Sequence, residues 1–253
     1  TAGRSEEIVG DWFAARGTRD KIILATKVIG RSSNDWFRDD GAPPKLDRKN
    51  ILEAVDKSLA RLKTDYIDLY QVQWPDEVPI EETLEAMTEL VSAGKVRAIG
   101  LSNESSWGTM SWLEAHRTKG LARVQSIQNT YNLVNRTFEV NLAELALRED
   151  VGLLAYSTLA QGFLTGKYLN GAEPKGARRT LFNRMARYEG PGAEEAYTAY
   201  VALAQEFGID PAQMAIAFAT ARPFTTATII GATSLAQLDV ALGAANLVVS
   251  EEL

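Results

Sequence analysis

The sequence predicts an α/β fold of parallel strands, and in particular a (β/α)8 TIM barrel. Strand and helix patterns alternate along nearly the whole chain, whose 253 residues suit one such barrel. The strand candidates are short and apolar on both faces, as parallel strands covered by helices are. No G-x-G-x-x-G motif follows any of them, which disfavours an open dinucleotide-binding sheet.

Six strands are predicted from the apolar runs, and a helix precedes the first of them. The strands are expected at residues 22–28, 66–73, 96–102, 124–129, 152–157 and 226–230, and the leading helix at residues 5–15. A closed barrel needs eight strands. We therefore expect a single-domain fragment over residues 1–253, an incomplete barrel in which six of eight parallel strands are present and the first two are missing.

The predicted helices carry apolar residues at steps of three and four, which places those residues on one face. This pattern is found at residues 51–62, 80–91 and 138–145. Gly94 is expected to end the second of these helices, and Asp210 and Ser234 are expected to cap two later ones. Residues 30–45 and 162–192 are predicted as long loops after strand ends, where barrel active sites are built.

Composition excludes several classes of function. The chain has no cysteine and one histidine, His116, so we expect no metal site, no disulfide and no thiolate nucleophile. Its net charge of −6 gives no general attraction to nucleic acid or to an anionic membrane surface. No apolar run approaches the roughly 20 residues that span a bilayer. We expect a cytoplasmic protein of unassigned oligomeric state, with His116 solvated on a helix.

Polar residues at the ends of the predicted strands are the first candidates for a site. Lys27 ends the first strand inside an apolar run, where burial would displace its pKa. It could form a Schiff base, acidify a neighbouring phenol, or extend to the rim. Ser102, Asn103 and Gln128 suit hydrogen bonds to an amide or a sugar, although Ser102 and Asn103 are equally compatible with helix capping. Tyr156 offers either a ring face for a planar ligand or a core contact.

Two segments are candidates for binding phosphate. Residues 156–168, YSTLAQGFLTGKY, combine two glycines with Lys167, so backbone N–H groups could surround a pyrophosphate while the lysine supplies charge. The arginines that follow could hold a 2′-phosphate or form a solvated basic loop; they are Arg178, Arg179, Arg184 and Arg187. Residues 231–234 lie before a helix N-terminus after the last strand, which is a second anion-binding position.

These segments together resemble the aldo-keto reductase superfamily, in register and over essentially the whole chain. The matching motifs are ATKV around Lys27, DYIDLYQVQWP, GKVRAIGLSN, SIQNTYN, LLAYSTLAQGFLTGKY and TIIGATSLAQL. Residues 135–144 and the segment LTGKYLNGAEPKGARRTLF are similar to the Tas-like branch. The resemblance implies a (β/α)8 barrel that reduces aldehydes and ketones by hydride transfer from NADPH. A tyrosine then donates the proton, assisted by a lysine, an aspartate and a histidine.

Residue roles follow from the resemblance, position by position. Lys27 is implied as the lysine of the catalytic tetrad, whose ammonium would lower the pKa of the tyrosine. Ser102, Asn103 and Gln128 would contact the nicotinamide carboxamide, and Tyr156 would stack on its ring. The implied pyrophosphate loop comprises Ser157, Leu159, Gln161, Leu164, Gly166 and Lys167. The implied adenosine-phosphate ligands are Gly231, Thr233 and Gln237. The position of the arginines after the loop, and not the resemblance, adds Arg178 and Arg184 as candidate ligands of a 2′-phosphate.

Three departures from the family pattern bear on function. The aspartate and the tyrosine of the tetrad would fall before Thr1, so this chain is expected to lack them. Gln73 stands where the family usually has histidine; an amide can orient a carbonyl group but cannot relay a proton. The Glu-Asn pair that would hold adenine is absent, with Val240 and Ala241 near those positions.

We therefore expect an NADP(H)-dependent reductase of small-molecule carbonyl substrates, with Lys27 and Gln73 in the catalytic site, whose 253 residues alone are inactive. One alternative is a non-catalytic regulatory protein of the same fold that binds the nicotinamide cofactor. Gln73 and the missing adenine clamp favour it. Another alternative is an aldolase in which Lys27 forms a Schiff base. The preference for NADPH over NADH rests on the arginine segment alone.

Overall fold

The computed structural model describes residues 2–30, 32, 37–38, 40–182, 185–250 and 252. It contains two compact units, Thr1–Gln128 and Asn129–Leu253. Within the described part of the chain, six parallel strands alternate with helices. This confirms the predicted α/β class with six parallel strands.

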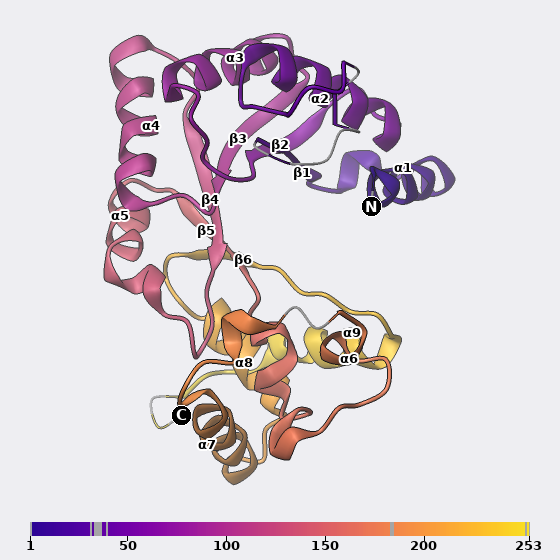
Figure 1. The fold of residues 1–253 in the computed structure, drawn as a ribbon, viewed down its shortest axis with the longest axis vertical. Coiled ribbons are helices and arrows are strands. Elements are labelled where there is room, and N and C mark those ends of the chain that lie inside the picture. Colours follow the sequence, from indigo (N-terminus) through magenta and orange to yellow (C-terminus); the bar gives the residue numbers. More distant parts are fainter. Residues whose placement is uncertain are drawn as a thin grey trace. The chain divides into compact units, whose positions relative to one another are not determined.

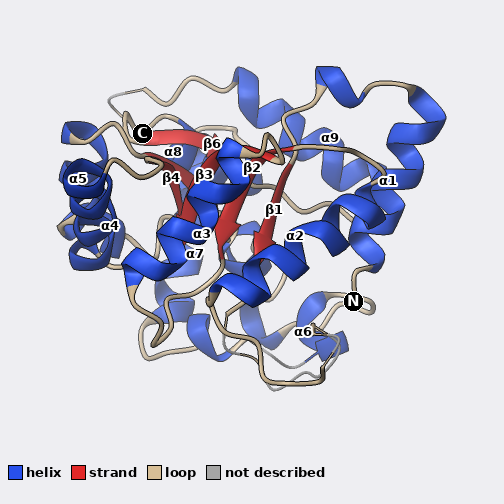
Figure 2. Cartoon of the chain, turned by 90° about the horizontal axis from the view of Figure 1, so that it is seen from above, coloured by secondary structure: helices blue, strands red, loops and turns tan. Residues whose placement is uncertain are grey.

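The first unit consists of alternating helices and strands (Figure 1). In chain order they are α1 (Arg4–Arg16), a short 3₁₀ helix (Arg19–Lys21), β1 (Ala25–Val28), α2 (Arg48–Leu62), β2 (Ile67–Val72), α3 (Ile80–Ser92), β3 (Val96–Ser102), α4 (Ser106–Lys119) and β4 (Val124–Thr130), whose last two residues belong to the second unit. Strands β1 to β4 pair in parallel in the order of the chain. Helices α2 and α3 lie side by side along strands β1 to β3 (Figure 2).

The register of these strands aligns one row of residues on a single face of the sheet. Lys27 lies opposite Gln71, Gln71 opposite Gly100, and Gly100 opposite Ser126. Because side chains alternate along a strand, Gln73 follows Gln71 on the same face. Strand pairing by itself therefore gathers polar groups near the carboxyl ends of these strands.

Apolar periodicity and capping explain why α2 forms where it does. Ile51, Val55 and Leu62 are buried on one face of the helix. The carboxylate of Asp47 accepts a hydrogen bond from the backbone N–H of Asn50 at 2.8 Å, which satisfies one of the unpaired donors of the first turn. Helix α2 therefore begins and packs as its sequence pattern predicts.

The predicted helix ends are confirmed elsewhere in the chain. Gly94 follows α3 with a φ of 73°, a conformation that favours glycine. Asp210 accepts a hydrogen bond from the N–H of Gln213 at 3.1 Å, and Ser234 accepts one from the N–H of Gln237 at 3.3 Å. Gly94 therefore follows the end of a helix, and Asp210 and Ser234 each cap the start of one, as predicted.

The second unit contains many short helices between its strands. In chain order they are a 3₁₀ helix (Thr137–Val140), α5 (Leu142–Arg148), β5 (Gly152–Tyr156), 3₁₀ helices at Ala160–Thr165 and Leu169–Gly171, α6 (Arg178–Phe182), a 3₁₀ helix (Ala186–Tyr188), α7 (Ala193–Glu206), α8 (Pro211–Thr220), β6 (Thr225–Thr228), α9 (Leu235–Gly243) and a 3₁₀ helix (Ala244–Asn246). Strands β5 and β6 pair in parallel. The rings of Tyr131, Phe138 and Phe224 pack together in its core, with centroids 5.3–6.4 Å apart.

Two of the strand predictions were too long. Strand β1 begins at Ala25 rather than at residue 22, and Ile23 is 84% exposed. Strand β6 ends at Thr228, before Ile229 and Ile230. An apolar run shows that residues suit a strand, but pairing with a neighbouring strand decides where the strand ends.

The prediction of a long loop over residues 162–192 was wrong. The segment contains α6 and several 3₁₀ turns, and Phe163, Tyr168, Met185 and Tyr188 are buried in one cluster. The prediction of a solvated His116 was also wrong. Its side chain is half-buried, and its Nδ1 lies 2.5 Å from the carbonyl oxygen of Leu121, so it closes the turn after α4.

Candidate active site

The carboxyl ends of strands β2, β3 and β4 bring four of the predicted site residues together. The side-chain amide of Asn103 donates to the carbonyl oxygen of Gln73 at 3.0 Å and to the hydroxyl of Ser102 at 3.1 Å. The backbone N–H of Asn103 donates to the carbonyl oxygen of Gln128 at 3.0 Å. Asn103 has a φ of 57°, in the left-handed region that asparagine tolerates better than most residues. It is therefore the residue that connects these three strand ends.

Lys27 lies in β1 on the same face of the sheet as Gln71 and Gln73. Its side chain is half-buried, and within the described residues its ammonium has no ion-pair or hydrogen-bond partner. Burial lowers the pKa of Lys27 below its ordinary value, because a poorly hydrated amine favours its neutral form. The structure thus places a lysine with a perturbed pKa at this edge, as the sequence predicts.

Sequence reasoning missed Gln71, which lies next to Lys27 in the register of the strands. Gln71 is 1% exposed, and its amide donates to the carbonyl oxygen of Leu101 at 3.3 Å. Gly100 keeps the adjacent space open, since a Cβ there would lie 2.6 Å from the hydroxyl of Ser126. The signal was present in YQVQ, because two glutamines at a spacing of two lie on the same face of a strand.

Sequence reasoning also missed Glu104, which directly follows Asn103. Its carboxylate accepts from the N–H of Ser105 at 2.8 Å and packs against the first turn of α4, where a Cβ at Gly108 would overlap it. Burial raises the pKa of Glu104 above its ordinary value, and the hydrogen bonds from Ser105 oppose that rise without cancelling it. The site edge therefore carries a carboxyl group that resists ionisation.

Replacement of Glu104 with glutamine is expected to stabilise the chain at neutral pH, by about 0.5–1 kcal/mol. A carboxyl group with a raised pKa favours folding when it is protonated, and that advantage is lost as pH rises through the raised pKa. Unfolding in urea should thus show Glu104→Gln to be more stable than the parent at pH 7 and equal to it below the ordinary pKa of 4.5. The exposed Glu114→Gln on α4 is the control, and an equal gain there would contradict the assignment.

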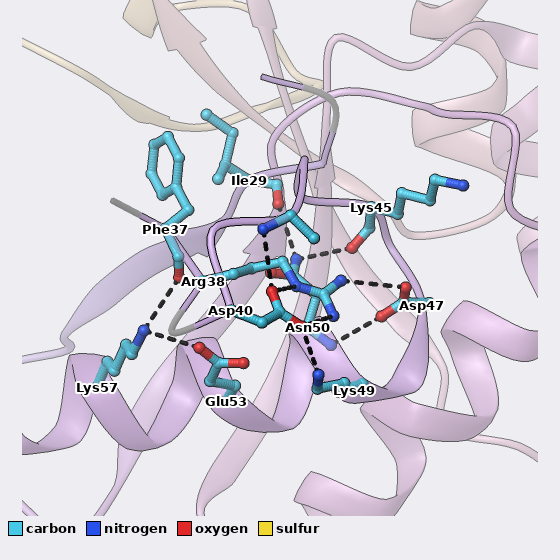
Figure 3. A network of polar contacts seen from close by, with 11 residues as sticks. Ile29, Phe37, Arg38, Asp40, Lys45, Asp47, Lys49, Asn50, Glu53 and Lys57 are labelled. Atoms are coloured by element: carbon cyan, nitrogen blue, oxygen red, sulfur yellow. Dashed lines mark hydrogen bonds and ion pairs between the residues drawn. The ribbon is translucent and has the colours of Figure 1, made fainter. Parts of the chain in front are cut away.

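The described part of the segment after β1 is tied to the start of α2 (Figure 3). The guanidinium of Arg38, whose side chain is 7% exposed, lies 3.2 Å from a carboxylate oxygen of Asp40 and 3.4 Å from one of Asp47. Lys57 on α2 donates to the carbonyl oxygen of Phe37 at 3.3 Å. A buried guanidinium needs such carboxylate partners, so this charge network holds the segment near the strand end that carries Lys27.

The second unit carries the predicted pyrophosphate loop directly after β5. The backbone is left-handed at Ser157, Gln161 and Gly162, with φ values of 57°, 59° and 103°. The side-chain oxygen of Gln161 is buried without a hydrogen-bond partner in the described part of the chain. Such an acceptor is costly unless it receives a donor, so it is available to a ligand.

The other residues of this loop contribute in different ways. Leu164 is 1% exposed in the core cluster and Leu159 packs against it, so these two leucines can offer only backbone groups to a ligand. Gly166 turns the chain with a φ of 78°. Lys167 folds over Gly162, where a Cβ would lie 2.9 Å from its ammonium nitrogen. The loop therefore has one cationic side chain lying across left-handed backbone.

The predicted arginine cluster is only partly free to bind phosphate. Arg179 lies 3.2 Å from a carboxylate oxygen of Glu189, and Arg187 donates to the hydroxyl of Tyr156 at 3.4 Å. Arg178 is exposed at the start of α6, and Arg184 lies outside the described residues. The spacing of arginines in sequence could not show that a glutamate ten residues away neutralises one of them.

The predicted adenosine segment is exposed at the start of α9. The side-chain oxygen of Gln237 accepts from the N–H of Thr233 at 2.8 Å and from its hydroxyl at 3.0 Å. Gly231 is exposed, with open space where a Cβ would stand. The segment is therefore a pre-ordered helix N-terminus, which suits an anion.

The described residues offer neither a cluster of metal ligands nor a membrane-spanning helix. Across the described residues, no three His, Asp or Glu side chains gather where they could hold a metal ion. Over the same residues, every helix is too short or too polar to cross a bilayer.

Comparison with known proteins identifies the class. The model of the Aldo/keto reductase family matches residues 1–253, and the chain belongs to this family. It is 47% identical to "Protein tas" of Escherichia coli K12 over 272 residues, covering 100% of this chain and 78% of that protein. It is 32% identical to a "Probable voltage-gated potassium channel subunit beta" of Arabidopsis thaliana over 255 residues, covering 97% and 75% of the two chains.

A solved structure supports the same assignment. An aldo/keto reductase of Klebsiella pneumoniae, crystallised in complex with NADP and acetate, superposes with a TM-score of 0.72 at 26% sequence identity. The match covers 99% of this chain and 73% of that one. The resemblance to aldo-keto reductases, including the Tas-like relatives, is confirmed.

Proposed function

We propose that this chain carries the cofactor-binding and carbonyl-positioning parts of an NADP(H)-dependent aldo-keto reductase that reduces aldehydes or ketones. The observation that carries the proposal is the grouping of Gln73, Ser102, Asn103 and Gln128 at one edge, with Lys27 on the adjacent strand. Membership of the family supplies the reaction class. The Klebsiella pneumoniae reductase, which was solved in complex with NADP, supports the choice of cofactor.

The second unit, taken by itself, carries residues that fit the phosphates and the ring of a nicotinamide dinucleotide. Gln161 offers a buried acceptor without a partner in the described part of the chain, and the helix N-terminus at Thr233 is exposed to receive a phosphate. Lys167 would supply positive charge, and Tyr156 a ring face. The cofactor, when bound, supplies the hydride for the carbonyl carbon.

Lys27 would stabilise negative charge that develops on the proton donor. A cation near a phenol lowers the pKa of that phenol, which makes the phenol a better acid near neutral pH. Burial disfavours the charged amine of Lys27, so an anionic partner would strengthen its hold on its proton. We match no aspartate or tyrosine of these 253 residues to the family's pair, and we propose that Lys27 requires them.

Two exposed tryptophans at the same edge suit a flat substrate. Trp74 directly follows Gln73 and is 47% exposed, and Trp107 lies in the first turn of α4 and is 76% exposed. An exposed indole offers a large apolar ring face together with one hydrogen-bond donor. We propose that they bind the body of an aromatic or alicyclic carbonyl compound whose oxygen is oriented by the amide of Gln73.

The 253-residue chain is expected to bind NADPH but not to reduce carbonyl compounds. A chimera that places the family's first two strands, taken from the Escherichia coli Tas protein, before Thr1 should reduce them at least 100-fold faster, the scale of a general acid. The measurement is NADPH oxidation with a panel of aliphatic and aromatic aldehydes. Equal turnover by the 253 residues and by the chimera would contradict this assignment of the proton donor.

A cofactor-binding regulatory protein is the second candidate function. The relative with the name of a potassium channel β subunit favours it, together with Gln73 in place of a protonatable histidine. Titration of NADPH fluorescence separates the two candidates. Tight binding by the chimera without turnover would support the regulatory function, and rapid turnover would remove it.

A further inference from the structure

A buried asparagine in the second unit connects three segments of the chain around the end of β5. Asn132 is fully buried and lies just after β4. Its side-chain amide nitrogen donates to the carbonyl oxygen of Ser157 at 2.8 Å and to the hydroxyl of Tyr188 at 3.0 Å. Its side-chain oxygen accepts from the N–H of Val134 at 3.0 Å. Both ends of this amide are therefore engaged, as its burial requires.

The backbone that carries the ring of Tyr156 depends on this amide. The N–H of Tyr131 donates to the carbonyl oxygen of Tyr156 at 3.2 Å, and Asn132 binds the next carbonyl group, that of Ser157. Ser157 has a φ of 57°, in the left-handed region that is costly for a serine. Hydrogen bonds to two consecutive carbonyl groups stabilise this turn, so they fix the backbone from which the ring of Tyr156 projects.

Tyr188 ties a later segment to the same place. It ends the 3₁₀ helix at Ala186–Tyr188 and is 4% exposed. Its hydroxyl accepts from Asn132 and lies 3.0 Å from the hydroxyl of Thr130. Because the amide nitrogen of Asn132 is only a donor, the proton of Tyr188 is left for the hydroxyl of Thr130. The carbonyl oxygen of Tyr188 accepts from the hydroxyl of Tyr197 at 2.7 Å, so its backbone is anchored as well as its side chain.

The neighbouring Arg187 contacts Tyr156 directly. Its guanidinium donates to the hydroxyl of Tyr156 at 3.4 Å, although the arginine is otherwise exposed. This bond is long, so the anchoring of the adjacent Tyr188 decides whether Arg187 stays within reach. Tyr156 is thus held at its carbonyl oxygen by Tyr131 and at its hydroxyl by Arg187.

We propose that Tyr188 is a positioning residue, which holds Tyr156 and Ser157 in place for the nicotinamide half of the cofactor. It acts on Ser157 through Asn132, and on Tyr156 through its chain neighbour Arg187. This inference rests on the proposed function, in which Tyr156 offers its ring face to the nicotinamide.

The effect of this network on binding is confined to one half of the cofactor. None of its hydrogen bonds involves Thr233 or Gln237, the proposed ligands of the adenosine phosphates. The network should therefore matter for NADPH but not for 2′,5′-ADP, which carries the adenosine phosphates without a nicotinamide. A general loss of folding would weaken the binding of both.

The test is isothermal titration calorimetry of the 253-residue chain with NADPH and with 2′,5′-ADP. Tyr188→Phe should weaken binding of NADPH about tenfold, the scale of one lost hydrogen bond and one amide N–H left unpaired. Its binding of 2′,5′-ADP should stay within about twofold of the parent's, which is well below that scale. Tyr200→Phe is the matched control, because it removes a hydroxyl that donates to the carbonyl oxygen of Leu133 at 3.2 Å, and it should change neither affinity.

Arg187→Met is a second variant, at an exposed position where folding should be retained. It should weaken binding of NADPH about threefold, the scale of one weak hydrogen bond, and leave 2′,5′-ADP unaffected. Weaker binding of 2′,5′-ADP by this variant would overturn the proposal, because Arg187 would then bind a phosphate group itself.

Two results with Tyr188→Phe would also overturn the proposal. One is equal weakening of both ligands, which a purely structural role would produce, and the other is unchanged binding of NADPH. Failure of the parent chain to bind NADPH would instead refute the proposed function, and this inference with it.

Discussion

Replacement of Gly10 with alanine is expected to lower the free energy of unfolding by about 2 kcal/mol. Gly10 is buried in α1, where it faces the last turn of α2. A Cβ at this position would overlap the carbonyl oxygen of Arg61 and lie 2.8 Å from the carbonyl carbon of Leu62. Alanine normally improves a helix by up to about 1 kcal/mol over glycine. Here the contact is with backbone, so the two helices must separate, and this cost exceeds the gain.

Urea denaturation at pH 7 measures this effect, with the slope of the transition as a check that the same surface is exposed. Gly190→Ala is the control, because a Cβ there would meet nothing within 4 Å. A midpoint for Gly10→Ala at or above that of the parent would show that α1 and α2 tolerate the added methyl group.

Replacement of Lys27 with methionine is expected to stabilise the 253-residue chain near neutral pH, by about 1–2 kcal/mol. Burial lowers the pKa of Lys27, and within the described residues no carboxylate compensates its charge. Methionine keeps a similar length and apolar stem without the desolvation cost. The same change should abolish turnover in the chimera, so stability and activity should move in opposite directions.

The pH dependence of this stabilisation has a defined sign. Below the lowered pKa of Lys27 the amine is protonated in both the folded and the unfolded chain. The folded parent then bears the full desolvation cost of the charged amine. Between that pKa and the ordinary value of 10.5, the unfolded chain binds more protons, so parent stability rises with pH. The advantage of Lys27→Met should therefore shrink as pH approaches 10.5. Urea denaturation at several pH values tests this, with exposed Lys21→Met as the control, and a constant advantage would contradict it.

Much of the fold could be predicted because local pattern and tertiary role agree. The mostly apolar run at residues 96–102 lies between Gly94 and Asn103. Strand β3 spans these same residues, Val96–Ser102. Residues 22–24 have the same apolar character, yet Ile23 is exposed and β1 begins later. Apolar character limits which residues can form a strand, whereas the neighbouring strand supplies the hydrogen bonds that define it.

The candidate site shows the same division. Asn103 and Ser102 could be predicted as candidates because small polar residues at strand ends are conspicuous in sequence. Gln71 and Glu104 were missed because their roles depend on burial, which comes from the opposing strand in one case and from α4 in the other. The pairing of Arg179 with Glu189 depends on how the intervening segment folds back on itself.

Local spacing in the sequence was enough to derive the order of strands and helices, the caps at Asp210 and Ser234 and the polar strand ends. Each of these features depends on residues within one or two helical turns or on the alternation of side chains along a strand. The tertiary structure alone decided which charges are neutralised and which groups have displaced pKa values. These properties depend on contacts between residues far apart in the chain. The low polarizability of the protein interior then makes each such contact, or its absence, energetically large.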